Sequence, residues 1–267
     1  MATANQGIRR GMKGMPTRRL TRLMMVLALL PLAGACGGGH DEGTNGPRTG
    51  TLRPTDPGDP GDHVVIATDN GLRLRPADGD HVTVDDRVDE HWSRHGKVWT
   101  LDVSCAERTD GGGNCPRMPY VEIPDGVSVT VTARNAGVDA AGVAAALDLT
   151  TVNGDVTVTR SGRDDADLRL STRNGSVRAT GVTAGRVHAQ TTNGDVVVRC
   201  AAVPSGVGAA TVNGSVDVTV PHDSPAYRVT ASTDNGRTTV AVPARDADKD
   251  HTMTLTTVNG DVDARRD

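Results

Sequence analysis

The sequence predicts an all-β protein, a β-solenoid (β-helix) built from coils of roughly 20 residues. Between residues 151 and 260 the pattern T-x-N-G occurs six times, from "TVNGDVTV" to the final "TVNGDVDA". Apolar and polar residues alternate on both sides of each Asn-Gly, as in strands that bury one face. Phe is absent and there are only two Trp and two Tyr. The core must therefore be filled by Val, Leu, Ala and Thr, which suits a stack of thin coils.

The N-terminal segment has the pattern of an export signal. Residues 1–22 contain six basic residues and no acid, and the apolar run "LMMVLALLPLAGA" ends at Cys36. This run is too short to span a bilayer permanently. An ordinary secretory signal followed by a free cysteine is one interpretation. "TRRLTRL" leaves open whether export uses the general secretory or the twin-arginine route.

The ending "LAGAC" resembles the lipobox of bacterial lipoproteins, although Ala33 stands where Leu is commoner. The resemblance implies that residues 1–35 are a lipoprotein signal peptide and that Cys36 becomes the first mature residue, carrying acyl chains such as palmitate. Two or three chains give stable attachment. We therefore expect a bacterial protein anchored by lipid on the extracytoplasmic face of the cell membrane.

Residues 36–62 continue from this cysteine as a Gly-, Pro- and Asp-rich stalk with almost nothing to bury. The whole chain has a net charge of −4, and the leader contributes six positive charges and no acid, so the remainder carries −10. Nucleic-acid affinity comes largely from neutralising phosphate. An acidic exported protein is therefore not expected to bind nucleic acid.

The cysteines outside the leader suggest a disulfide. Cys105 and Cys115 flank the glycine-containing loop "AERTDGGGN", and disulfides are common outside the cytoplasm. We expect these two residues to be paired. Cys200 is then left over, either as a buried thiol at the end of a strand or as a replacement for one member of the pair. The spacing matches no zinc pattern.

Each Asn-Gly is expected to form a fixed corner between two short strands, with Gly supplying a positive φ. An earlier, degenerate unit stands at Asn135, and Asn70 is the candidate for another. Stacking in register would place Thr over Thr and Asn over Asn, so that both columns form hydrogen-bonded ladders. The six expected corners are Asn153-Gly154, Asn174-Gly175, Asn193-Gly194, Asn213-Gly214, Asn235-Gly236 and Asn259-Gly260.

A meander of β-hairpins is the alternative, because Asn-Gly between alternating hydrophobic residues is also a strong hairpin signal. Two features favour the solenoid. The same residue types recur at the same register, and the segments that join the units vary in length and sequence. Successive coils are then expected to lie one on another, seven or eight in all.

The open ends of such a stack need covers. Residues 63–127 contain both Trp and are expected to form irregular first coils and an N-terminal cap. Residues 128–267 form the regular repeats, and the charged C-terminal "DARRD" is expected to discourage pairing at the other end.

The T-x-NG-x-V-x-V units, the segment "YVEIPDGVSVTVTARNAG" and the leader together resemble the bacterial putative-adhesin family of β-strand-repeat domains. The likeness covers roughly residues 64–265. It implies a right-handed single-stranded β-helix and no catalytic residues, because the molecular role of the family is largely undefined.

Outward-facing polar residues are the only candidates for chemistry. Asp155 and Asp195 would lie two coils apart, ~9–10 Å, which is near the carboxylate separation of inverting glycosidases. Asp-rich exported repeats sometimes bind calcium, but the period here differs. His91 and His95 lack the Glu of a zinc-protease motif. We therefore expect no enzyme, no cofactor and no metal site.

The sequence favours an envelope lipoprotein that displays a β-helix for binding or structural, adhesin-like interaction. Its partners would be the membrane, through the lipid anchor, and an envelope glycan or protein. A polysaccharide-acting enzyme is one alternative, and an accessory protein for envelope stress or signalling is another. A hydroxyl-rich or apolar strip along the coils would favour a protein ligand.

Overall fold

A computed structural model describes residues 63–104, 116–244 and 250–267, all within the compact unit Arg48–Asp267. The leader, the stalk, Cys36 and the loop with Cys105 and Cys115 lie outside the described residues. Those described contain 20 strands and no helix. No helix among them could therefore cross a membrane.

The strands form two sheets of ten. In spatial order, the first sheet contains β17 (Arg228–Asn235), β19 (Thr252–Asn259), β15 (Gly206–Ala210), β13 (Arg186–Gln190), β11 (Asp167–Ser171), β9 (Leu147–Thr150), β7 (Ser128–Ala133), β1 (His63–Thr68), β5 (Val98–Ser104) and β4 (Asp89–His95). The second contains β18 (Thr238–Val240), β20 (Val262–Arg266), β16 (Val216–Val220), β14 (Val196–Cys200), β12 (Val177–Val182), β10 (Val156–Thr159), β8 (Val138–Ala141), β2 (Leu72–Pro76), β6 (Tyr120–Ile123) and β3 (Thr83–Val84).

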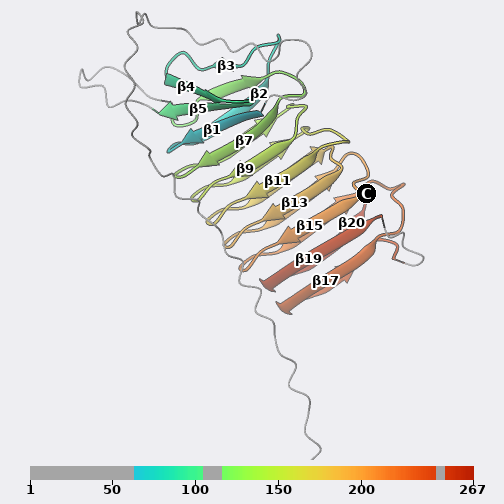
Figure 1. Ribbon diagram of the computed structural model, residues 1–267. Helices are drawn as coiled ribbons and strands as arrows, with labels where there is room; N and C mark the ends of the chain where they lie inside the picture. Colours follow the sequence, from blue (N-terminus) through green and yellow to red (C-terminus); the bar gives the residue numbers. More distant parts are fainter. Residues whose placement is uncertain (1–62, 105–115, 245–249) are drawn as a thin grey trace, which may run out of the picture. The chain divides into compact units, whose positions relative to one another are not determined.

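The predicted β-solenoid is confirmed. Each coil contributes one strand to each sheet, and neighbouring coils pair in parallel, as Figure 1 shows. The register places like over like: Val156 pairs with Val177, and Leu168 pairs with Leu147. The hairpin alternative is wrong for the six Asn-Gly units, because strands joined by a hairpin turn would be antiparallel.

The core is a thin aliphatic layer between the two sheets. Strands alternate between buried and more exposed residues, for example in β10 and β11. Val158, Leu170 and Val198 are at most 1% exposed. Such burial contributes about 25 cal/mol per Å² of apolar surface, and each coil obtains it only from its neighbours. The repetition of the sequence is thus what makes a core possible.

The order of coils departs from the order of the chain at both ends. The expectation that successive coils lie one on another holds from β7 to β16. Beyond this, the last coil (β19, β20) lies between the β15–β16 coil and the β17–β18 coil. Near the N-terminus, the β1–β2 coil lies between the β5–β6 and β7–β8 coils. We call each pair of strands at the same height in the two sheets a level. The described residues form nine levels of parallel strands rather than the seven or eight coils expected.

The two ends of the stack are finished differently. At one end β4 pairs antiparallel with β5, and β3 pairs antiparallel with β6. The guanidinium of Arg94 lies 4.6 Å from the ring centroid of Trp99. At the other end β17 and β18 are the last strands. The expectation that "DARRD" ends the stack is wrong, because β20 is paired on both sides.

Candidate functional site

The Asn-Gly corners carry a ladder of side-chain amides. Five of the six corner asparagines donate from Nδ2 to the Oδ1 of the asparagine in a neighbouring coil, and Asn153 only accepts. An amide can do this across the spacing of stacked strands because its donor and acceptor lie on opposite sides. The five bonds, all 2.9 Å, join Asn174 to Asn153, Asn193 to Asn174, Asn213 to Asn193, Asn259 to Asn213 and Asn235 to Asn259.

The glycine of each corner lies directly against the glycine of the next coil. Gly175 has a φ of +156° and Gly194 a φ of +143°. A Cβ atom at Gly194 would overlap the carbonyl oxygen of Gly175. The position therefore requires Gly both for its backbone conformation and for the close approach.

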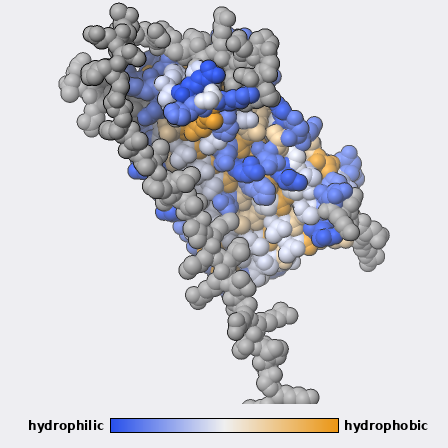
Figure 2. Space-filling model, in the orientation of Figure 1, coloured by the Kyte–Doolittle hydropathy of each residue, from blue (hydrophilic) through white to orange (hydrophobic). Residues whose placement is uncertain are grey.

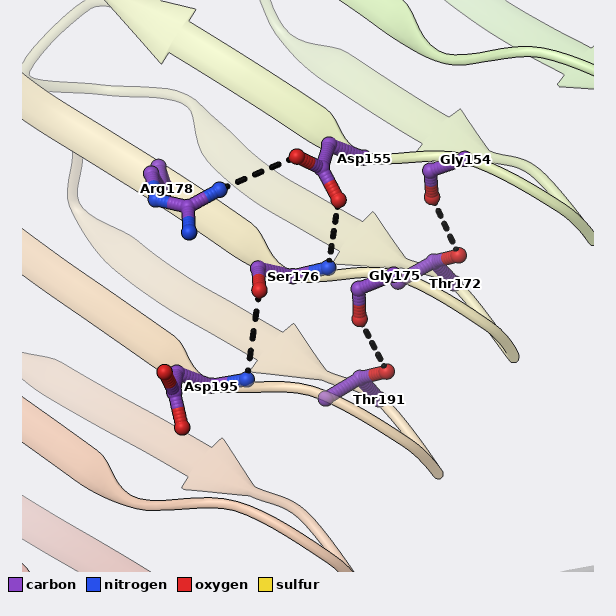
Figure 3. Close-up of polar contacts among 8 residues, drawn as sticks. All are labelled: Gly154, Asp155, Thr172, Gly175, Ser176, Arg178, Thr191 and Asp195. Carbon is purple, nitrogen blue, oxygen red and sulfur yellow. Dashed lines mark hydrogen bonds and ion pairs between the residues drawn. The ribbon is translucent and has the colours of Figure 1, made fainter.

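The threonine two residues before each Asn is bonded differently from the prediction. Thr172 Oγ1 donates to the carbonyl oxygen of Gly154, and Thr191 Oγ1 donates to that of Gly175, at 2.7 and 2.8 Å (Figure 3). The expected Thr-to-Thr ladder is wrong. Stacked strands are ~4.8 Å apart, which is too far for direct hydroxyl-to-hydroxyl bonds between equivalent atoms, whereas the glycine carbonyl reaches across.

A third column alternates between Asp and Ser and binds backbone amides. Asp155 Oδ1 accepts a 2.8 Å hydrogen bond from the N–H of Ser176, and Ser176 Oγ accepts one from the N–H of Asp195 at 3.3 Å (Figure 3). Asp195 then accepts from the N–H of Ser215. Serine between the acidic residues keeps like charges off adjacent coils, where they would destabilise the stack.

The two carboxylates considered for glycoside chemistry, those of Asp155 and Asp195, accept hydrogen bonds from groups of the neighbouring coil. Asp155 binds the amide of Ser176 with Oδ1 and the guanidinium of Arg178 with Oδ2, at 3.0 Å. Asp195 binds the amide of Ser215. Both carboxylates thus have structural partners along the stack, and neither is poised against the other. Among the described residues, no group of three or more His, Cys, Asp or Glu could hold a metal ion.

The cysteine and histidine residues considered from the sequence also lack the surroundings of a reactive site. Cys200 is a free thiol, 5% exposed, at the end of β14. Burial, with a smaller effect from the charge of Asp267, raises its pKa to about 12, so it is a poor nucleophile. His91 and His95 are exposed on β4, a strand rather than a helix. Cys36, Cys105 and Cys115 lie outside the described residues.

The outer face of the first sheet carries a patch that sequence reasoning missed. On β15, β19 and β17 the outward side chains are small and uncharged, except for Arg228 and Asp234 near the two ends of β17. Figure 2 shows the surface near the β17 end of the stack as pale rather than strongly polar. Register alone could have located it, because outward positions are every second residue of each unit. We call it the hydroxyl patch: Gly206, Gly208, Ala210, Thr252, Thr254, Thr256, Thr230 and Ser232, with Arg228 at its corner.

The repeat geometry matches a known family. The model of the Toastrack DUF4097 family matches residues 117–265. The chain belongs to this family. The stacked coils, the Asn ladder and the Gly column are therefore features of a Toastrack chain, and the family description itself states no activity.

Two solved structures are similar to this Toastrack protein. A "putative cell adhesion protein" from Clostridium sporogenes ATCC 15579 is 8% identical, with a TM-score of 0.33, over 78% of this chain and 94% of that chain. A "putative adhesin" from Bacteroides fragilis NCTC 9343 is 12% identical, with a TM-score of 0.41, over 82% and 98%. No curated protein gives a significant match.

Proposed function

We propose that this Toastrack protein is a lipid-anchored envelope protein that acts by binding, without catalysis, and that its ligand is an envelope protein or glycan. The basic leader, the lipobox-like "LAGAC" and the stalk support export and anchoring at Cys36. The Asn, Thr and Asp/Ser columns support a binding rather than a catalytic role, because hydrogen bonds between coils engage them.

The hydroxyl patch is the observation that carries this proposal. The Asn and Thr residues that recur in the six Asn-Gly coils are engaged in hydrogen bonds within the stack, whereas the outward rows vary from coil to coil. Thr230, Thr254 and Ser232 are exposed, carry hydroxyls that donate and accept hydrogen bonds, and lie side by side on the neighbouring strands β17 and β19. Charged residues are depleted in the centres of protein interfaces, so an uncharged patch favours a protein ligand over a strongly acidic glycan.

A pull-down from cell envelopes tests the proposal. The bait is the soluble chain lacking residues 1–36, compared with the same bait carrying Thr254→Lys, which places a charge in the patch. Arg173→Asp, at an exposed corner, is the matched control. Capture that is lost only with Thr254→Lys supports binding through the patch. Capture of neither protein nor glycan by the wild-type bait overturns the proposal.

Anchoring is tested separately with Cys36→Ser in the full chain. The substitution removes the sulfur that would carry the lipid, so the protein should move from the membrane fraction to the soluble fraction. Unchanged membrane association would refute lipidation at this residue, while leaving the binding proposal open to its own test.

A further inference from the structure

The end of the stack formed by β17 and β18 leaves its inward side chains uncovered. Val240 is 41% exposed, whereas Val218, in the same column two levels inside, is fully buried. Val229 and Ala231 are half-buried, whereas Val207 and Ala209 are each 3% exposed. All three residues of β18 are exposed. Among the described residues, no strand lies beyond this level.

The backbone of β17 is also unpaired along its outer edge. The N–H of Arg228 donates to the carbonyl oxygen of His251, on the side of β19, at 2.9 Å. Backbone groups of successive residues in a strand point to alternate sides. Val229, Ala231 and Thr233 therefore direct their N–H and C=O groups away from the stack, where they are available to another strand.

The opposite end presents a different edge. Its last strands, β4 and β3, are antiparallel to their neighbours, and β4 carries Asp89, Glu90, Arg94 and two histidines. Charged side chains on an edge strand discourage pairing. Strand β17 instead carries small and hydroxyl residues with one charge near each end of "RVTASTD".

We propose that the β17 edge binds the β17 edge of a second copy of this chain, antiparallel and about a two-fold axis at Ala231. This register places Arg228 opposite Asp234 of the second copy, because each lies three residues from Ala231. It also places Val229 opposite Thr233, and Thr230 opposite Ser232. The axis thus creates two Arg228–Asp234 pairs, and each pair of opposite charges contributes a fraction of a kcal/mol to about 1 kcal/mol.

The symmetry explains why the contact would stop at two copies. An isologous contact uses the same surface on both partners and closes. A head-to-tail contact, from β17 to β4, would leave an edge at each end and continue into filaments. The pairing involves one level of each stack, which is smaller than a standard interface. The dimer is therefore weak, with dissociation expected at about micromolar to millimolar concentration.

Sedimentation velocity of the purified full chain over a concentration series tests this contact. The wild type should pass from monomer to dimer as concentration rises. Arg228→Asp and Asp234→Arg should each weaken dimerisation at least about tenfold, because each puts two like-charge pairs across the axis. The double variant Arg228→Asp/Asp234→Arg should restore it. Arg173→Asp, at an exposed arginine on an interior level, should have no effect.

Backbone pairing is tested by hydrogen exchange. In the wild type, the amides of Val229, Ala231 and Thr233 should exchange more slowly at high than at low concentration, and this difference should vanish in Arg228→Asp. Circular dichroism establishes that each variant is folded. A monomer at every concentration, filaments in place of dimers, or a double variant no better than the single ones would each overturn the proposal. Thr254→Lys should leave dimerisation unchanged, which separates this contact from ligand binding by the hydroxyl patch.

Discussion

Asn259 donates from Nδ2 to Oδ1 of Asn213 at 2.9 Å, although 46 residues separate them in the chain. The coil that carries Asn235 follows the Asn213 coil in the sequence but does not lie next to it. The coil that carries Asn259 lies between the two. Strands β19 and β20 thereby acquire neighbours on both sides. The C-terminus, which frays in most domains unless it is tied down, is held inside the stack.

Substitutions in the β19–β20 coil should consequently cost as much stability as those in an interior coil. Substitutions in the β17–β18 coil, at the end of the stack, should cost less. Leu255 in β19 is 0% exposed, so Leu255→Ala should lower the free energy of unfolding by about 2–5 kcal/mol. Val229 in β17 packs against the core only in part, and Val229→Ala should cost less than about 1 kcal/mol. Urea denaturation monitored by circular dichroism measures both. Equal costs would contradict the observed order of levels.

Two buried threonines make a matched test of the hydrogen bonds between coils. Thr211 and Thr219 are 5% and 4% exposed. Thr211 Oγ1 donates to the carbonyl oxygen of Gly194 at 2.8 Å, whereas Thr219 Oγ1 has no hydrogen-bond partner among the described residues.

Thr211→Val should therefore destabilise by about 1–2 kcal/mol, since it leaves a carbonyl unsatisfied. Thr219→Val removes a buried hydroxyl that makes no hydrogen bond within the part of the chain that the structure describes, and it should be neutral or stabilising. The urea midpoint of Thr211→Val should therefore lie below that of the wild type, and the midpoint of Thr219→Val should equal or exceed it. A larger loss at Thr219 would indicate that its hydroxyl has a partner in solution.

Much of the fold could be read from the sequence, because the coil is a local object. Period-two alternation around Asn153 or Asn193 specifies which side chains point inward, and the recurrence of Asn predicts stacking in register. The Asn ladder follows from this register. The acceptor of the Thr hydroxyl did not follow, because it depends on where the Gly carbonyl points, a property of the three-dimensional corner rather than of the repeat.

The exchanged order of the last coils is non-local, yet the sequence carries traces of it. Thr238 occupies a column otherwise filled by Val, and Arg237 stands where the other corners have Asp or Ser. Both changes mark the Asn235 coil as a poor interior level. The segments before and after this coil, "TVPHDSPAYR" and "AVPARDADKDH", are longer than most others, as a chain that passes over a level requires. These residues indicate that the Asn235 coil lies at an end of the stack. That the edge of β17 is unpaired follows only from the strand order of the structure.

Gly194 should not tolerate any side chain. A methyl group there would overlap the carbonyl oxygen of Gly175, and the φ of +143° is unfavourable for other residues. Gly194→Ala should cost more than about 3 kcal/mol, through overpacking and strain. Gly79→Ala, where a Cβ meets nothing within 4 Å, should change stability by no more than about 1 kcal/mol. Thermal denaturation separates the two, and a mild effect at Gly194 would mean that adjacent coils can move apart.

The amide ladder should be sensitive to the direction of its bonds. In Asn193→Asp the carboxylate can still accept from Asn213, but it faces Oδ1 of Asn174 without a donor. The expected cost is about 1–3 kcal/mol at neutral pH. In Asn153→Asp the accepting role toward Asn174 is kept, so the loss should be under about 0.5 kcal/mol. Similar losses in chemical denaturation would show that charge, not bond direction, causes the effect.

Stability should fall in alkaline solution because of two buried groups near the C-terminus. Burial raises the pKa of Cys200 from 9.0 to about 12. Burial also raises the pKa of Tyr227 from 10.0 to about 12, and its hydroxyl donates to the carbonyl oxygen of Pro204 at 2.7 Å. Each folded-state pKa lies above the unfolded value. The unfolded chain therefore loses these protons first, and deprotonation favours unfolding.

The contribution of both groups should be fully present below about pH 9 and lost progressively as pH rises toward 12. Urea midpoints measured across this range should decrease more steeply for the wild type than for the double variant Cys200→Ala/Tyr227→Phe, in which neither group titrates. Peptide mapping after iodoacetamide treatment at neutral pH provides an independent check. Cys200 should be alkylated only after denaturation, because its thiol is buried and protonated; rapid alkylation of the native protein would contradict the burial of this end of β14.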